Sequence, residues 1–452
     1  VVRFDQRHSN TASRFQRLEY TTDGTNWVSA GVFETNAGAT TWYNNRTVDL
    51  SGVAGANNNA NFGVRIVSIF DPANNTSYSA AQPGSTYGTA GTIRYDAVTI
   101  SAGSVWIGGS GTDLSTAANY SGGVAPASTG TGLFGSAGGS NTSVSTSAGG
   151  NSLDQVIFQA GASAYTVSGT GTLTLRAGVL NNATAPQTIS APITFGNQNA
   201  VYNTGTLTLS GAIGFTNQLW LQGGVTHLGG AVTGTGAVRV IGGTLNAGGT
   251  INAPVSVMSG GSLVGTGTVG GNVTVAAGGT IRGDSGAGTG NLNVTTGLTS
   301  IQAATTNGAN LATQLAVSGG AITGNSKLAL TGASTNLAFD MTTGKFRITL
   351  LGDAGLTTGN TYTIALATAT AATNFYRNGS NTDPFTTADF DVVSGSGTWT
   401  AFNSVSLVRN AGTNSLDLTF SPVPEPATVG LIAAGVLAAG TFVRRKLRPT
   451  AM

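Results

Sequence analysis

The sequence predicts an all-β protein, built as a truncated antiparallel β-sandwich, then a parallel β-helix (solenoid), then a single C-terminal transmembrane helix. Three observations support this prediction. Apolar and polar residues alternate in many short runs, which is the pattern of strands with one buried face. Glycine pairs recur every 18 or 19 residues in the middle of the chain. A run of uncharged apolar residues followed by a basic cluster lies at the end.

The composition excludes several classes of protein. Only 8% of the 452 residues are charged and 69 are glycine, so serine, threonine, asparagine and glycine must form most of the surface. The net charge of +2 excludes nucleic-acid binding through a strongly basic face. The chain has no cysteine, which removes disulfides, thiolate metal sites and cysteine nucleophiles. With 40% hydrophobic residues it can still bury a long core.

Residues 1–103 are richer in charged and aromatic residues than the middle of the chain, and they predict the β-sandwich. Asp23-Gly24 separates two alternating runs, which is a hairpin signal. Residues 62–70 are apolar on nearly every position and favour a central strand, and residues 92–100 predict a further strand. The chain enters this region partway through a strand, so we expect the sandwich to be truncated.

This region also resembles the later part of a jelly-roll-like module found in secreted bacterial proteins. The resemblance rests on Phe4-Asp5-Gln6-Arg7, the turn at residues 22–27, the asparagine-rich stretch at 57–66 and the run from Arg94 to Ile100. It implies a sandwich that contacts glycans or another surface.

Residues 104–300 are nearly free of charge and predict the β-helix. Strand fragments such as 171–175 and 205–209 both read Gly-Thr-Leu-Thr-Leu, in which threonine alternates strictly with leucine after the glycine. Glycine pairs stand at 223–224, 242–243, 260–261 and 278–279. An interval of this length fits about one coil of a β-helix, in which each coil buries its apolar face on its neighbours. Glycine supplies the positive φ that the corners need, and threonine suits the outward face.

The stretch 260–281 resembles the passenger repeats of autotransporter-associated β-strand proteins, and Trp106, Asp113 and Asn119-Tyr120 resemble the opening of such a region. The resemblance implies a passenger-like β-helix. From residue 301 to 421 the glycine repeat loses its register while strand patterns continue. We therefore expect the last coils and a capping β-region there.

Residues 422–452 carry the strongest local signal. A proline-rich motif is followed by 17 uncharged residues, 427–443, and then by a basic cluster. At 1.5 Å per residue a helix over 427–443 spans about 26 Å, near the lower limit for crossing a bilayer. The basic residues favour a cytoplasmic C-terminus, which places the body of the protein outside. The motif residues are Val423, Pro424, Glu425 and Pro426, and the basic stop consists of Arg444, Arg445, Lys446 and Arg448.

This order of motif, apolar helix and basic cluster resembles the PEP-CTERM sorting domain. The resemblance implies recognition by a membrane exosortase, processing near the motif, and delivery to the cell envelope or extracellular matrix of a Gram-negative bacterium. Because such proteins occur in species that make exopolysaccharide, exopolysaccharide or other surface glycans are candidate partners.

Residues that could support catalysis are sparse. Some β-helix proteins are polysaccharide lyases or hydrolases, and these need clustered carboxylates or a base beside an acid. The middle of the chain offers Asp154, His227 and Arg239 among few others, at separations that need not place them on one face. We expect no catalytic site, no metal site and no cofactor.

Four further features are expected to have no chemical role. His8 and His227 are expected to be surface or turn residues. Asp389 and Asp391 are expected to be like charges on an exposed strand rather than calcium ligands. Arg282-Gly283-Asp284 spells an integrin-type tripeptide, which we interpret as a chance match at a coil corner with its charges facing water.

Three functions compete. The first is a structural or adhesive protein of the cell surface or extracellular matrix, which is the function we favour. The second is a carbohydrate-binding surface protein acting through Trp27, Trp42 and Tyr43, if these lie on one concave face. The third is a β-helix enzyme that degrades polysaccharide, which would need two carboxylates within catalytic reach.

Overall fold

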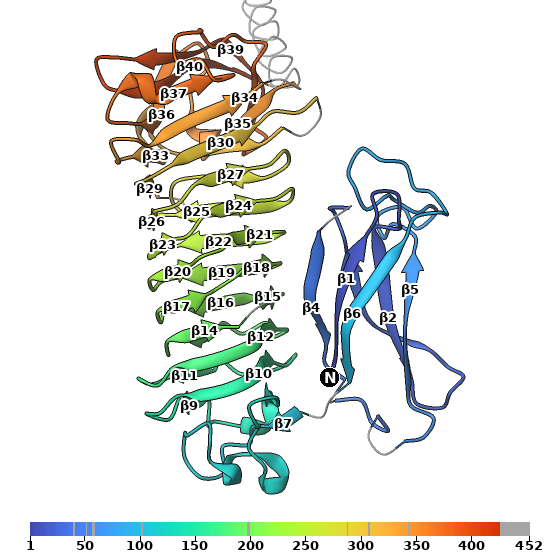
Figure 1. Cartoon of the computed structure of the whole chain (residues 1–452). Coiled ribbons are helices and arrows are strands. Elements are labelled where there is room, and N and C mark those ends of the chain that lie inside the picture. Colours follow the sequence, from blue (N-terminus) through green and yellow to red (C-terminus); the bar gives the residue numbers. More distant parts are fainter. Residues whose placement is uncertain are drawn as a thin grey trace, which may run out of the picture. The chain divides into compact units, whose positions relative to one another are not determined.

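The computed structural model describes residues 1–38, 41–50, 52–56, 59–100, 103–196, 199–286, 288–305, 308–341 and 344–424. The chain forms two compact units, residues 1–255 and 256–452. Strands dominate both (Figure 1). The described part also contains the short 3-10 helices η1 (Ala117–Asn119), η2 (Ser121–Gly123), η3 (Ser136–Gly138), η4 (Asp353–Gly355) and η5 (Ala372–Asn374). The predicted all-β class with large parallel sheets is confirmed.

The first unit begins with two three-stranded antiparallel sheets, ordered β4-β1-β6 and β3-β2-β5. Their strands are β1 (Val2–His8), β2 (Phe15–Thr21), β3 (Val28–Glu34), β4 (Trp42–Val48), β5 (Gly63–Ile69) and β6 (Ile93–Ile100). The predicted hairpin around Asp23-Gly24 is confirmed, because β2 and β3 pair antiparallel with Tyr20 opposite Val28.

One prediction for this region is wrong. The segment 62–70 was expected to form a central strand, but β5 pairs with β2 alone and lies at a sheet edge. The reason is that Arg65 and Ser68 point toward solvent and the apolar residues of β5 are only half-buried. The central strand is β2, whose Leu18 is fully buried.

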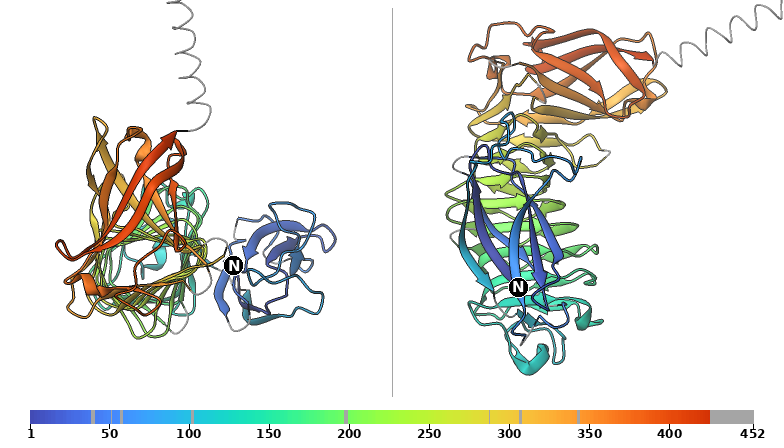
Figure 2. Two further views of the ribbon diagram at one scale, coloured as in Figure 1. Left: turned by 90° about the horizontal axis from the view of Figure 1, so that it is seen from above. Right: turned by 90° about the vertical axis from the view of Figure 1, so that its right-hand side faces the viewer.

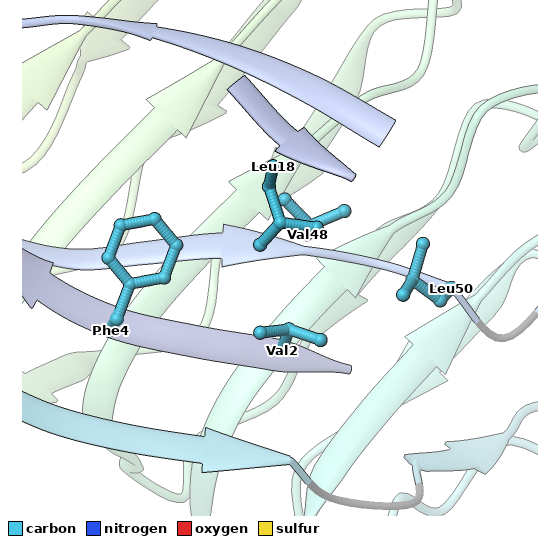
Figure 3. Close-up of a cluster of buried hydrophobic side chains, with 5 residues drawn as sticks. All are labelled: Val2, Phe4, Leu18, Val48 and Leu50. Atoms are coloured by element: carbon cyan, nitrogen blue, oxygen red, sulfur yellow. The ribbon is translucent and has the colours of Figure 1, made fainter. Parts of the chain in front are cut away.

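The two sheets enclose a small apolar core. Figure 3 shows the side chains of Phe4, Leu18 and Val48 pointing toward one another, with Val2 and Leu50 beside them. These five side chains are at most 6% exposed. Burial of such side chains stabilises each by about 1.5–3 kcal/mol relative to exposure, so the cluster anchors both sheets.

The rest of the first unit is a stack of coils in which parallel strands form three rows (Figures 1 and 2). Row A contains β7 (Gly103–Val105), β8 (Thr131–Phe134), β10 (Asn151–Phe158), β12 (Leu173–Asn181), β15 (Asn199–Asn203), β18 (Leu219–Gln222) and β21 (Val238–Val240). Row B contains the first halves of β10 and β12, then β14 (Ile193–Phe195), β17 (Ile213–Phe215), β20 (Val232–Gly234) and β23 (Thr250–Asn252). Row C contains β9 (Ser143–Ser145), β11 (Thr166–Ser168), β13 (Gln187–Ile189), β16 (Thr206–Leu209), β19 (Val225–Leu228) and β22 (Gly243–Ala247).

Successive coils of this stack are in register. Ile213 pairs with Val232, and Thr226 with Leu245, each 19 positions later. This is the spacing of the glycine pairs, and it is consistent with a parallel β-solenoid. Gly223 and Gly243 have φ of 73° and 70°, and a Cβ on Gly243 would lie 2.3 Å from the carbonyl of Gly223. The predicted corner role of glycine is confirmed at these positions.

One corner of the stack holds buried asparagines. Asn181 donates through Nδ2 to Oδ1 of Asn203 at 2.9 Å, and Asn203 donates through its own Nδ2 to the carbonyl of Val225 at 2.8 Å. Oδ1 of Asn203 also accepts from the backbone N–H of Gly205 at 3.0 Å. The side-chain amides thereby form hydrogen bonds with backbone groups that the strand pairing does not satisfy at this corner.

Replacing Asn203 with alanine should therefore lower the free energy of unfolding by about 1–3 kcal/mol, because Asn181, Gly205 and Val225 each lose a hydrogen bond to the buried amide. Urea denaturation checks the value. The exposed Ser210 lies in the same region, and Ser210→Ala should shift the midpoint little. Equal midpoints for the two variants would show that the amide contacts do not contribute.

The second unit contains three rows of parallel strands of its own. The first contains β25 (Gly261–Gly265), β28 (Thr280–Ile281), β31 (Asn310–Ser318), β35 (Phe346–Leu351) and β38 (Phe390–Ser394). The second contains β26 (Thr268–Val269), β29 (Asn291–Val294), β33 (Lys327–Leu330) and β36 (Tyr362–Thr368). The third contains β27 (Val273–Val275), β30 (Leu298–Gln302), β34 (Asn336–Asp340) and β37 (Phe375–Arg377). β24 (Val255–Val257) spans the boundary of the two units.

The coils of this unit lengthen along the chain. Ser262 pairs with Thr280, 18 positions later, whereas Leu298 pairs with Asn336, 38 later, and Phe346 with Phe390, 44 later. The glycine repeat loses its register after residue 300 because the added residues form excursions, such as β32 (Ala321–Asn325), which folds back antiparallel on β31. The parallel pairing itself continues to Ser394.

An antiparallel hairpin ends the described chain. It consists of β39 (Trp399–Asn410) and β40 (Ser415–Pro424), and β40 also pairs antiparallel with β36. Leu416, Leu418 and Phe420 of β40 are fully buried. The hairpin therefore occupies an edge of β36 that would otherwise expose backbone groups, as expected of a capping region.

Candidate functional site

The C-terminal sorting segment begins inside the last strand. Val423 and Pro424 end β40, where Val423 pairs with Ala401 and Pro424 with Trp399 of β39. Proline has no N–H, so Pro422 and Pro424 cannot donate to this ladder. The chain thus leaves the sheet as an extended segment that has fewer backbone hydrogen bonds to β39.

The remainder of the predicted segment lies outside the described residues. This applies to Glu425 and Pro426, to the predicted helix over 427–443, and to the basic residues Arg444, Arg445, Lys446 and Arg448. Within the part of the chain that the structure describes, no helix is long and apolar enough to span a bilayer.

The three aromatic residues considered for sugar binding do not share a free face. Tyr43 is 1% exposed and packs edge to face on Trp220, with 5.8 Å between ring centroids. Trp27 lies under the guanidinium of Arg65 at 4.2 Å, on the sheet that contains β5. Trp42 belongs to β4 of the other sheet. Tyr43 in particular has no ring face available for a ligand.

Asp154 and the Arg239–Trp220 pair lie where the sandwich meets the coils of the first unit, and the ring of Trp220 packs on Tyr43 of the sandwich. Asp154 accepts from Arg3 of β1 at 2.5 Å, and Arg239 lies 5.5 Å from the ring centroid of Trp220. Tyr202 donates from its hydroxyl to the carbonyl of Asn44 at 2.6 Å. Burial raises the pKa of the Tyr202 phenol, which remains a neutral donor. These residues therefore serve an internal interface rather than a catalytic site.

His227 lies on the outward side of row C, between Thr208 and Asn246 of the adjacent coils. Its Nδ1 is 2.9 Å from Nδ2 of Asn246, which makes Nδ1 the acceptor in this hydrogen bond. Partial burial lowers the pKa of His227 and favours the neutral ring. The residue is half-exposed, as predicted for a surface position.

His8 was expected at the surface, and this prediction is wrong. His8 ends β1 and is fully buried. Its Nδ1 lies 2.7 Å from the carbonyl of Ser13, and its Nε2 lies 3.3 Å from Oγ1 of Thr35. Thr35 in turn accepts from Nη2 of Arg46 at 3.0 Å. Because a carbonyl only accepts, Nδ1 carries the proton and Nε2 accepts from Thr35.

The buried guanidinium of Arg46 determines the charge of this cluster. Arg46 is 0% exposed, donates to the carbonyl of Glu34 at 2.5 Å, and lies 4.8 Å from the ring centroid of Tyr43. Burial and the charge of Arg46 lower the pKa of His8 to about 4. His8 is therefore neutral at physiological pH, and the cluster is a structural feature of the sandwich core.

The aspartates near residue 390 also differ from expectation. Asp389 is 4% exposed and accepts from Nε and Nη2 of Arg377, each at 2.8 Å, whereas Asp391 is exposed and pairs with Lys345 at 2.8 Å. Burial alone would raise the pKa of Asp389, but the hydrogen bonds from Arg377 and Thr386 together outweigh it and lower the pKa. The expectation of an exposed charge therefore holds for Asp391 and fails for Asp389. The alternation pattern of one strand could not distinguish the two aspartates, because it places both on the same face.

The integrin-type tripeptide is not presented as a free loop. Asp284 has a φ of 65°, and its carboxylate accepts from the backbone N–H groups of Ser285, Gly286 and Gly290. Arg282 donates to the carbonyl of Asp284 at 3.1 Å. The carboxylate thus organises its own loop instead of facing water as expected.

The described part of the first unit contains hollows at the edges of the sandwich, of which two concern the candidate sites. One of about 320 Å³ lies between β3 and β4 of the sandwich and the strands of row A, and its lining includes Val32, Asp49 and Tyr202. The other, of about 450 Å³, is lined by Arg7, Ser9, Asn10, Thr11, Thr92 and Arg94. Sequence reasoning named Arg7 and Arg94 only in separate motifs and did not bring them together, because 87 positions separate them and only strand pairing makes them neighbours. No group of three histidines, aspartates or glutamates among the described residues could hold a metal ion.

Comparison with known proteins identifies one family. The model of the PEP-CTERM protein-sorting motif matches residues 422–446, which include the predicted motif and Arg444, Arg445 and Lys446. Neither the curated proteins nor the solved structures that were searched gave a match. The presence of the sorting motif is thus confirmed, and it implies an exported, envelope-associated protein that is sorted by an exosortase.

Proposed function

We propose that this chain is a structural or adhesive protein of the cell surface or extracellular matrix, with sparsely charged coils that act as a stiff spacer. The observation that carries the proposal is the sorting motif, which begins within the last strand of the folded body. A body with so few charges and a repetitive stacked core suits a passive scaffold. No catalytic activity and no cofactor belong to this proposal.

The proposal includes the topology of the tail. The run 427–443 forms a membrane helix, the four basic residues after it stay in the cytoplasm, and the exosortase acts near Pro424-Glu425-Pro426. The extended end of β40, with two prolines that cannot donate, supports processing there, because a protease needs an extended chain that separates easily from its sheet. The passenger-like repeats assigned from residues 260–281 belong to the same proposal.

Deleting residues 427–448 should move the protein from the membrane fraction to the soluble fraction. The reason is that the deletion removes the apolar run and its basic stop together. Cell fractionation and immunoblotting in a bacterium with an exosortase check this, with surface labelling of the intact chain as a second readout. A variant with glutamine at Arg347, an exposed position in β35, controls for loss of charge. Soluble, correctly exported protein with the tail intact would contradict the sorting proposal.

Carbohydrate binding through Trp27, Trp42 and Tyr43 is the weaker alternative, since Tyr43 is buried and the two tryptophans belong to different sheets. A polysaccharide-degrading activity is weaker still, because Asp154 is engaged with Arg3 and His227 with Asn246. Incubation with polysaccharides and assay for reducing ends or unsaturated products tests the enzyme alternative directly.

A further inference from the structure

The sandwich brings two arginines together at one end of a sheet. Arg7 of β1 pairs directly with Arg94 of β6 in the antiparallel ladder, so both side chains project from the same face. Both line the hollow of about 450 Å³. Its other lining residues are Ser9, Asn10, Thr11 and Thr92.

This arrangement is electrostatically unfavourable by itself. Like charges directly opposite each other destabilise an antiparallel pair. None of the ion pairs formed within the described ranges includes Arg7 or Arg94. The next acidic residues on these strands, Asp5 and Asp96, oppose each other two positions away. In a chain with 8% charged residues, a paired cationic position in a hollow indicates an anionic ligand.

The guanidinium of Arg7 is held in place. It lies 5.2 Å from the ring centroid of Trp42, the residue that pairs with Arg7 on the other side in β4. Contact with an aromatic face leaves the in-plane N–H donors of a guanidinium available, and two such donors match the two oxygens of a carboxylate.

The wall of the hollow is also rigid. Ser9 donates its backbone N–H to the carbonyl of Thr92 at 2.9 Å, and Oγ of Ser9 accepts from the N–H of Thr92 at 2.8 Å. A Cβ added to Gly38 would lie 2.4 Å from Oδ1 of Asn10, so the neighbouring loop packs tightly on this wall. The hollow is therefore pre-organised, which reduces the entropic cost of binding.

We propose that this hollow binds an acidic sugar, with the carboxylate of a uronic acid residue held by Arg7 and Arg94. Hydroxyl and amide groups from Ser9, Asn10, Thr11 and Thr92 line the same space and can bond the hydroxyls of a sugar ring. A free inorganic anion would use the guanidinium pair alone. The proposal gives the surface protein a partner class, acidic polysaccharide, and it rests on the sandwich rather than on the sorting segment.

Calorimetry on the purified full chain, kept in mild detergent, tests this site. Tri-galacturonate is the probe, galactotriose is the neutral counterpart, and sodium sulfate and sodium phosphate represent free anions. Arg7→Gln and Arg94→Gln should each weaken tri-galacturonate binding at least about tenfold, since each removes charge-assisted hydrogen bonds. Arg347→Gln in β35 changes charge equally outside the hollow and should leave binding unchanged.

Each other outcome counts against the site. Equal binding of galactotriose and tri-galacturonate would overturn the role of the carboxylate, and equal binding of sulfate or phosphate would overturn the role of the sugar. Binding unchanged in both arginine variants, while circular dichroism shows them folded, would place the ligand elsewhere. Absence of tri-galacturonate binding would refute the proposal and leave the membrane delivery of the chain unaffected.

Discussion

Replacing Leu209 with alanine should lower the free energy of unfolding of the first unit by about 2–5 kcal/mol. Leu209 is 0% exposed and pairs in parallel with Ile189 of one adjacent coil and Leu228 of the other, both also 0% exposed. Equivalent positions in three successive coils thus form a continuous stack of apolar side chains. Shortening the middle side chain creates a cavity that rigid backbone ladders on both sides cannot close.

The matched control is the preceding residue. Thr208 points outward on the same strand, between Thr188 and His227, so Thr208→Ala should change stability by less than about 0.5 kcal/mol. Urea denaturation followed by circular dichroism compares the two variants with the original chain. Similar losses for both would contradict the alternation of inward and outward positions, and with it the stacked core.

The coils were predictable because their signal is local. Alternation places Leu207 and Leu209 on one face without knowledge of any distant residue, and glycines such as Gly243 mark the corners because only glycine fits a positive φ against a neighbouring carbonyl. Coils were expected after residue 300, but their greater length was not predicted, for a related reason. Excursions such as β31–β32 add residues between rows and erase the constant spacing while leaving strand pairing intact.

The sorting segment was predictable on the same ground, since its parts follow one another within residues 422–446. The other site residues depend on tertiary structure. Arg7 meets Arg94 through the register of β1 and β6, and Tyr43 meets Trp220 through docking of the sandwich on the coils. No local sequence pattern predicts either contact. His8 was misjudged because its flanking residues resemble a loop, although it lies in the core.

Acidification from pH 7 to pH 4.5 should destabilise the sandwich by roughly 2 kcal/mol through His8 alone. The pKa of His8 falls from its ordinary value of 6.5 to about 4 because the ring is buried beside Arg46. Between these values the unfolded chain binds a proton that the folded chain does not, so stability is complete above about pH 6.5 and is lost as the pH falls toward 4. Below pH 4 both states are protonated and the loss reaches its limit.

Urea midpoints at pH 7, 6, 5 and 4.5, followed by tryptophan fluorescence, measure this dependence. His8→Asn retains a donor for the carbonyl of Ser13 and removes the titration, so its midpoint should depend much less on pH in this window. The chain has only one other histidine, and His227→Asn should preserve most of the slope because that ring is half-exposed. Carboxylates whose pKa is lowered, such as Glu19 and Asp71, also destabilise the folded chain when they are protonated, but mainly below the pH range that is measured. A slope that survives in H8N would show that the buried histidine is not what makes the sandwich acid-sensitive.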